Sequence, residues 1–193
     1  MRTITQFRML RSFWISSLVL MMLAPFLRSS VVSAQSAAPP PNGTRAAPNF
    51  SRVDLSHKKI ELSSYRGKVV LLNFWATWCG PCLTEIPTFT AWQMEYGSEK
   101  LQVIGVSMDD AAPEVVAATN KLKLNYPVLM GDAHLGTAYG GVLGLPVTFL
   151  IDRQGNIRAR YDGAASLMDI KRDIQALLGA TTRPRSTPYT SNR

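Results

Sequence analysis

Cys79 and Cys82 are the only cysteines in this chain of 193 residues, and two residues separate them. An apolar run of β-type residues at 69–75 ends shortly before them, and a helical pattern begins at Leu83. We therefore expect the pair where a buried strand turns into a helix, so that free N–H groups and the helix dipole stabilise a thiolate on Cys79. Because the gap is short, the sulfur of Cys82 can reach that of Cys79. Such a dithiol can attack a disulfide and then resolve the mixed intermediate itself.

A purely structural disulfide is the competing interpretation of the same two cysteines. It would suit an exported protein, because disulfides persist in oxidising compartments. However, a bridge over a two-residue gap closes almost no loop and gains little stability by restricting the unfolded chain. A structural cross-link normally joins distant segments. The spacing therefore favours a redox-active pair.

Residues 1–34 have the composition of an export signal. Three arginines precede an apolar stretch of 15 residues at 13–27, and small residues at 32–34 offer a cleavage site ahead of Gln35. An uncleaved membrane anchor is the alternative, although 15 apolar residues fall short of the roughly 20 that span a bilayer. Either interpretation places the rest of the chain outside the cytoplasm.

Both ends of the chain differ from its middle. Residues 35–47 form a Pro- and Ala-rich linker, and residues 181–193 form a basic tail that we expect to be disordered. The net charge of +8 arises outside residues 46–180: eight of the 21 basic residues lie there, so 13 remain within against 13 acidic residues. The formal neutrality of this part of the chain gives no indication of a phosphate-binding surface, so no nucleic-acid partner is predicted.

Strand and helix patterns alternate through residues 48–180, which we expect to form one α/β domain. The predicted strands cover residues 50–55, 59–62, 69–75, 101–107, 126–129, 147–152 and 156–161, and the predicted helices cover 83–96, 113–124, 132–139 and 166–178. Pro87 is expected to kink the first helix. This order predicts a mixed central sheet with helices on both faces.

Four motifs narrow the interpretation. They are Leu-Ser-Ser-Tyr-Arg-Gly-Lys at 62–68, Trp-Cys-Gly-Pro-Cys at 78–82, Glu-Ile-Pro at 85–87 and Gly-Leu-Pro-Val-Thr-Phe-Leu-Ile-Asp at 144–152. Together they resemble the TlpA/ResA-like family of extracytoplasmic thiol–disulfide oxidoreductases. The resemblance covers about residues 48–180 and implies the thioredoxin fold with an N-terminal β-hairpin. Pro146 lies 64 positions after Cys82, a spacing that fits the extra strand and helix of a TlpA-type insertion.

The cysteines receive different roles from their positions. Cys79, at the helix start, is the expected attacking thiol, and Cys82, one turn further on, is the expected resolving thiol. The dipeptide Gly80-Pro81 between them is the one found in thioredoxin, which implies a reducing potential near the roughly −270 mV of that protein. Trp78 is expected to shield Cys79 and, together with Gly80 and Pro81, to contact the substrate.

Pro146 matches the cis-proline of the family, which faces the cysteine pair. A cis peptide bond there would present the backbone of Leu145 to an extended substrate segment by strand-like pairing. A trans proline that simply begins a strand is the alternative, and it would be the default for an X–Pro bond outside this family. The resemblance favours the cis form and a substrate-binding role for Leu145 and Pro146.

Glu85 lies three residues after Cys82, so a helix would place both side chains on the same face. A partly buried carboxyl there would have a raised pKa and could exchange a proton with Cys82. Members of the family often carry an acid at this place, whereas Asn73 occupies the place of the buried aspartate of thioredoxins. A solvated glutamate favoured by the helix dipole is the alternative.

The resemblance implies an enzyme that reduces disulfides in exported proteins, in the bacterial periplasm or on the outer face of the membrane. Apocytochrome c, which must be reduced before haem attachment, is one implied substrate. A membrane thiol-electron transporter is the implied source of electrons. We expect a monomer that needs no cofactor. Other exported disulfides, including those of copper-site cysteines, are the alternative substrates.

Two other classes of function make different demands on the sequence. A peroxiredoxin-like peroxidase would need a Pro-x-x-x-Thr-type loop before its reactive cysteine, and no such loop precedes Cys79. A copper-binding module of related fold would need a three-residue gap between its cysteines and a downstream histidine, whereas here the gap is two and only His134 follows. His57 and His134 are isolated, so no metal site is predicted, because metal sites need several converging ligands.

Overall fold

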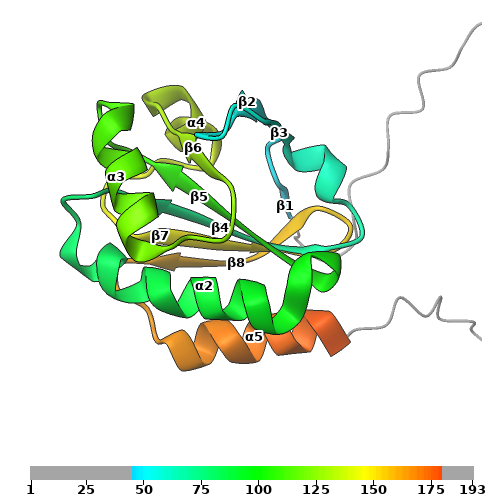
Figure 1. Cartoon of the computed structure of the whole chain (residues 1–193). Helices are drawn as coiled ribbons and strands as arrows, with labels where there is room; N and C mark the ends of the chain where they lie inside the picture. Colours follow the sequence, from blue (N-terminus) through cyan, green and yellow to red (C-terminus); the bar gives the residue numbers. More distant parts are fainter. Residues whose placement is uncertain (1–44, 180–193) are drawn as a thin grey trace, which may run out of the picture. The chain divides into compact units, whose positions relative to one another are not determined.

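The computed structural model describes residues 45–179, in which helices surround a central β-sheet (Figure 1). The strands are β1 (Arg45–Ala46), β2 (Ser51–Val53), β3 (Lys59–Glu61), β4 (Val69–Trp75), β5 (Leu101–Ser107), β6 (Val128–Met130), β7 (Val147–Ile151) and β8 (Asn156–Asp162). The helices are the short 3₁₀ helix η1 (Leu62–Tyr65), α2 (Gly80–Lys100), α3 (Ala112–Leu122), α4 (Ala133–Ala138) and α5 (Leu167–Gly179).

The central sheet contains six strands in the order β1-β8-β7-β4-β5-β6, and β2 and β3 form a separate hairpin. β4, β5 and β6 run parallel, whereas β7 is antiparallel to β4, and β8 is antiparallel to β7. Every residue of β4 and β5 is buried, which explains why both strands are mainly apolar and do not alternate; Asn73, Gln102 and Ser107 are their buried polar residues. The predicted mixed sheet and N-terminal hairpin are therefore confirmed.

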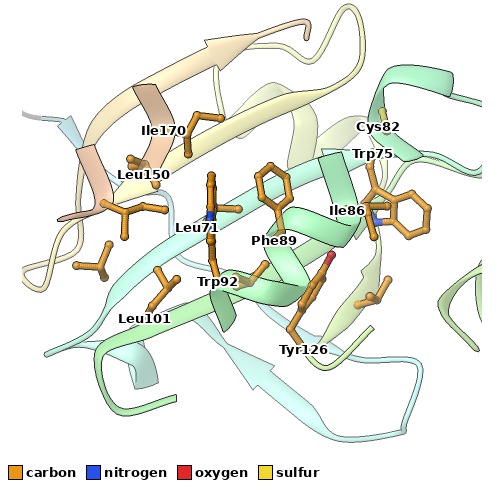
Figure 2. Close-up of a cluster of buried hydrophobic side chains, with 14 of the residues drawn as sticks. Leu71, Trp75, Cys82, Ile86, Phe89, Trp92, Leu101, Tyr126, Leu150 and Ile170 are labelled. Atoms are coloured by element: carbon orange, nitrogen blue, oxygen red, sulfur yellow. The ribbon is translucent and has the colours of Figure 1, made fainter. Parts of the chain in front are cut away.

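Helices cover both faces of this sheet. α2 and α3 connect β4 to β5 and β5 to β6, and right-handed crossovers that step in one direction place their helices on the same face. α5 lies beside α2 on that face (Figure 1). Figure 2 shows the cluster beneath these helices, with Cys82 at one end and Leu101 at the other. α4, η1 and the β2–β3 hairpin pack on the opposite face.

α2 begins three residues before the predicted start, because Cys79 acts as its N-cap. The helix continues through Pro87, where a kink was expected. The backbone departs from helical geometry at a different residue. Gly97 is the residue with non-helical dihedral angles, φ 66° and ψ 161°. Those angles are accessible to glycine and strained for residues with a Cβ, which explains why the break falls at Gly97.

The predicted signal, residues 1–34, and the predicted tail, residues 181–193, lie outside the described residues. The predicted linker, 35–47, is partly corrected by the structure. Its Arg45 and Ala46 form β1 and pair with Ile157 and Asn156 of β8, because the outer edge of β8 offers main-chain groups for pairing. Among the helices of residues 45–179, none is long and apolar enough to cross a membrane.

Candidate active site

Cys79 and Cys82 are joined by a disulfide bond, with their Cα atoms 5.3 Å apart. Cys79 lies at the end of the loop that follows β4, and Cys82 lies in the first turn of α2. The backbone N–H of Cys82 donates a hydrogen bond to Sγ of Cys79 at 3.3 Å. The first cysteine therefore occupies the N-cap position, where its sulfur receives an N–H that the helix itself leaves without a partner.

This position has a chemical consequence for the reduced protein. When the disulfide is opened, a thiolate at Cys79 keeps the N–H of Cys82 as a charge-assisted donor and lies at the positive end of the α2 dipole. Both effects favour the thiolate over the thiol, and the thiolate is the nucleophilic form. The exposed fractions are 5% for Cys79 and 1% for Cys82, so the first sulfur is the more accessible of two nearly covered ones.

An apolar wall lies behind the disulfide. Cys82 belongs to the same buried cluster as Trp75, Ile86 and Phe89, and Figure 2 shows the Trp75 indole close to Ile86 at the end of the cluster that Cys82 occupies. Gly105 makes room for that indole, because a Cβ at this position would lie 3.1 Å from Nε1 of Trp75. The wall keeps water away from the resolving sulfur.

Glu85 lies in the second turn of α2 and is buried, with 4% of its surface exposed. Its Oε1 accepts a hydrogen bond from the backbone N–H of Ala165 at 3.3 Å, whereas Oε2 has no partner among the described residues. Burial raises the pKa of this carboxyl, and the Ala165 N–H opposes the rise only in part. The structure thus provides the buried acid that the sequence predicted, rather than a solvated glutamate.

The Leu145–Pro146 peptide bond is cis, as predicted. β7 begins directly after it, and the pairing of Val147 with Phe74 sets Pro146 beside the end of β4, from which the loop to Cys79 departs. Leu145 packs against the cluster that contains both cysteines. Within residues 45–179, its N–H and C=O make no backbone hydrogen bond, so they are available for pairing with another chain.

The surface around the disulfide is apolar and uncovered. Trp78 has 70% of its surface exposed, and Gly80 and Pro81 are also exposed. Leu143, in the loop that leads to the cis-proline, is fully exposed. Figure 1 shows the loop between β4 and α2 and the loop before β7 at the same end of the sheet. Trp78, Gly80 and Pro81 are thus presented to solvent at this end of the sheet, whereas Leu145 is half-buried and Pro146 is buried.

One group at this end was missed by the sequence interpretation. Asp109 follows β5, and its carboxylate accepts hydrogen bonds from Thr77, in the loop before Cys79, and from Ser107. A signal was available, because the carboxyl ends of parallel strands meet at the same edge of a sheet. Asp109 follows β5 just as the cysteine loop follows β4, and the two strands are parallel neighbours.

The predicted histidines lie apart from this site. His57 is an exposed residue in the turn between β2 and β3, and His134 is exposed on α4, on the opposite face of the sheet from α2. Within residues 45–179, no three His, Cys, Asp or Glu side chains form a group that could hold a metal ion.

The fold and the disulfide at the start of α2 agree with what is found in known proteins. A model of the AhpC/TSA family matches residues 44–160. The chain belongs to the AhpC/TSA family. It is 36% identical to the thiol-disulfide oxidoreductase ResA of Bacillus thuringiensis subsp. konkukian (strain 97-27) over 119 residues, which is 62% of this chain and 69% of that protein. It is 34% identical to the thioredoxin-like protein YneN of Bacillus subtilis (strain 168) over 131 residues, or 66% of this chain and 76% of that one.

A solved structure of another protein has a fold similar to that of this chain. The thiol:disulfide interchange protein of the thioredoxin family from Chlorobium tepidum TLS superposes with a TM-score of 0.66 at 32% sequence identity, covering 72% of this chain and 99% of that one. These relatives confirm the thioredoxin fold and the ResA/TlpA-like resemblance. The family member is therefore a thiol–disulfide oxidoreductase. Cys79 and Cys82 are the two cysteines of its sequence, and they are bonded to each other.

Proposed function

We propose that this oxidoreductase reduces disulfides in exported proteins, with Cys79 as the attacking thiol and Cys82 as the resolving thiol. The observation that supports this assignment most strongly is the placement of Cys79 as the N-cap of α2, with Cys82 buried one turn behind it. The helix N-terminus stabilises a thiolate at the first position, and the apolar wall protects the second sulfur from competing thiols.

The reaction proceeds by two exchange steps. The Cys79 thiolate attacks one sulfur of the substrate disulfide, forming a mixed disulfide and releasing the other substrate sulfur as a thiolate, which takes up a proton. The Cys82 thiol then loses its proton and attacks Sγ of Cys79. The second substrate sulfur leaves as a thiolate, and the protein is left with the Cys79–Cys82 disulfide. Two electrons have passed from the protein to the substrate.

Glu85 is the proposed proton acceptor for Cys82 in the second step. The carboxyl lies one helical turn after this cysteine, so both side chains lie on the same face of α2. Because burial raises its pKa, the carboxylate is a stronger base than a solvated glutamate and accepts a thiol proton more readily. In the opposite direction, the protonated form returns the proton to Cys82.

Docking is proposed to use the backbone of Leu145 and the apolar surface around Cys79. The unpaired N–H and C=O of Leu145 can form strand-like hydrogen bonds with an extended segment on either side of the substrate disulfide. Trp78, Gly80 and Pro81 then contact its side chains. Extended segments with cysteines are common to many exported proteins, so this mode of binding is compatible with several substrates.

Because residues 1–34 have the composition of an export signal, we propose that the enzyme acts outside the cytoplasm, in the periplasm or on the outer face of the membrane. There a membrane thiol transporter would return it to the reduced form. Apocytochrome c is one substrate consistent with this placement, because its two cysteines must be reduced before haem is attached. Disulfides of other exported proteins, including those of copper-site cysteines, are alternative substrates for the same reaction. We propose that the protein acts as a monomer and without a cofactor.

The reduction potential tests the proposed direction of electron flow. The purified protein is equilibrated with defined ratios of reduced and oxidised dithiothreitol or glutathione, and the fraction of disulfide is measured by alkylation. A potential near about −270 mV supports a reductase. A value near about −120 mV, in the range of a strong oxidant, would show that the protein forms disulfides instead.

A trapping experiment tests the assignment of the two thiols. Cys82→Ser is expected to accumulate mixed disulfides with a cysteine-containing substrate peptide, because nothing displaces the substrate from Cys79. Cys79→Ser is the matched control and should accumulate far less. Equal trapping by the two variants would contradict the assigned order of attack.

A further inference from the structure

The carboxylate of Asp109 connects the ends of the two central strands. Its Oδ1 and Oδ2 accept the backbone N–H of Thr77 at 3.2 and 3.0 Å. Oδ1 also accepts the Thr77 hydroxyl at 2.5 Å, and Oδ2 accepts the Ser107 hydroxyl at 2.6 Å. We call these three residues the Asp109 network. It extends the contact between β4 and β5 beyond the last paired residues, Trp75 and Ser107.

The network holds the loop that carries the attacking thiol. Thr77 lies two residues before Cys79, and the loop from Ala76 to Cys79 is the whole connection between β4 and α2. Within it, the N–H of Cys79 donates to the carbonyl of Ala76 at 3.2 Å. Trp78 is mostly exposed and provides little packing to hold the loop. Ala76 and Cys79 are buried in the cluster beneath α2, and Asp109 adds a polar attachment of the middle of the loop to the end of β5.

The usual structural role of an aspartate at this place would be to cap the helix that follows. Asp109 and Asp110 lie shortly before α3, which begins at Ala112, and capping would satisfy one of its free N–H groups. The structure shows a different arrangement. The N-cap of α3 is Ala111, which makes no side-chain cap hydrogen bond. The Asp109 carboxylate points instead to the cysteine loop, where it accepts four hydrogen bonds within the network.

We propose that Asp109 is a positioning residue for the dithiol. By fixing Thr77 it keeps Sγ of Cys79 within reach of Cys82, which raises the effective concentration of one sulfur at the other. The inference rests on the proposed redox role of the pair. According to this inference, Asp109, which lies outside the cysteine motif, influences how readily the Cys79–Cys82 disulfide closes.

The consequence is a change in the redox equilibrium. When the reduced protein reacts with oxidised glutathione, two protein thiols become the Cys79–Cys82 disulfide and one glutathione disulfide becomes two thiols, so that electrons and protons balance. A looser loop lowers the equilibrium constant for ring closure. It also slows attack of Cys82 on a mixed disulfide at Cys79, because both steps need the same approach of the two sulfurs.

The experiment compares four variants of the purified protein. Asp109→Ala removes the whole network, and Thr77→Val removes only the hydroxyl bond. Thr77→Ser keeps both donors and is the conservative variant. Asp54→Ala is the matched control, because the Asp54 carboxylate also accepts two backbone N–H groups, from Ser56 and Lys58 at 2.8 Å, but in the β2–β3 turn on the opposite face of the sheet.

The reduction potential and the rate of mixed-disulfide resolution are measured together with the free energy of unfolding. Asp109→Ala is expected to lower the equilibrium constant for disulfide formation about tenfold, which makes the potential less negative by about 30 mV, and to slow resolution by a similar factor. Thr77→Val should change both in the same direction by a smaller factor, and Thr77→Ser should match the wild type.

The outcome separates this inference from the proposed function. If Asp109→Ala and Asp54→Ala lose stability but both keep the wild-type potential and resolution rate, Asp109 is an ordinary structural residue and the inference fails. Thr77→Val provides the same comparison should Asp109→Ala not fold. A wild-type potential in the oxidant range would overturn the proposed reductase direction, yet a shift between the variants would still support the positioning role.

Discussion

Replacing Trp78 with alanine separates the proposed binding role from folding, because this side chain lies on the exposed surface beside the disulfide rather than in the core. A tryptophan side chain presents roughly 200 Å², and with 70% of its surface exposed about 140 Å² of it is open to a partner. A docked peptide that covers one face of the ring removes about half of that area from water. At about 25 cal/mol per Å², the binding contribution is about 1.8 kcal/mol, or roughly a 20-fold change in affinity.

The expected result is therefore a rise of roughly 20-fold in KM for a disulfide-containing peptide, with a smaller effect on kcat, because the contact exists before and during the exchange step. The assay follows peptide reduction with dithiothreitol as the electron donor. Unfolding in urea is measured in parallel. The part of the ring that folding already covers limits the loss of stability to about 1.5 kcal/mol.

Met94→Ala is the matched control, because Met94 is exposed to a similar degree, 74%, but lies on α2 twelve residues after Cys82. Its replacement should leave KM unchanged. The reasoning about Trp78 would be refuted by a KM within threefold of the wild-type value, or by an equal rise in KM for Met94→Ala. Either result would mean that the exposed indole does not meet the substrate.

Two further predictions concern the interior behind the disulfide. Glu85→Gln should remove a pH dependence of stability. The folded protein holds the Glu85 proton more tightly than the unfolded chain, so the wild type loses stability as the pH rises from the ordinary carboxyl pKa to the raised one. The free energy of unfolding in urea, measured across that pH range, should therefore change less for the variant. The same variant should slow proton-dependent resolution by Cys82, and an unchanged pH profile of thiol reactivity would contradict a proton-transfer role for Glu85. Phe89→Ala should destabilise the protein by about 3–5 kcal/mol, because the ring is fully buried against Trp92 under α2; a loss below about 1 kcal/mol in urea unfolding would mean that the core relaxes around the cavity.

The two central strands were predictable from local sequence. The run at 69–75 is apolar at almost every position, as a strand buried on both faces requires, and the structure gives β4 the same bounds. Leu101–Ser107 was equally clear. The start of α2 was placed too late, because a cysteine is an uncommon N-cap and only the Cys82 N–H on its sulfur reveals the role.

Other features depend on contacts between segments far apart in the chain. β1 could not be inferred from Arg45 and Ala46, since two residues carry no periodicity and the pairing partner lies more than a hundred positions later. The environment of Glu85 includes the backbone N–H of Ala165, which lies 80 positions later in the chain. For the same reason the sequence could suggest an acid on the correct helical face but could not show that one oxygen lacks a partner.

The short segment between β8 and α5 joins two parts of the site. The N–H of Gly163 donates to the carbonyl of Pro146 at 2.8 Å, and two residues later the N–H of Ala165 donates to the Glu85 carboxyl. A partner that docks against Pro146 and shifts this segment changes the proton affinity of Glu85. Reciprocity then requires ionisation of Glu85 to change the affinity for that partner by the same factor. Proton uptake measured on binding would consequently report how strongly a given partner engages the proline loop, even before any electrons are exchanged.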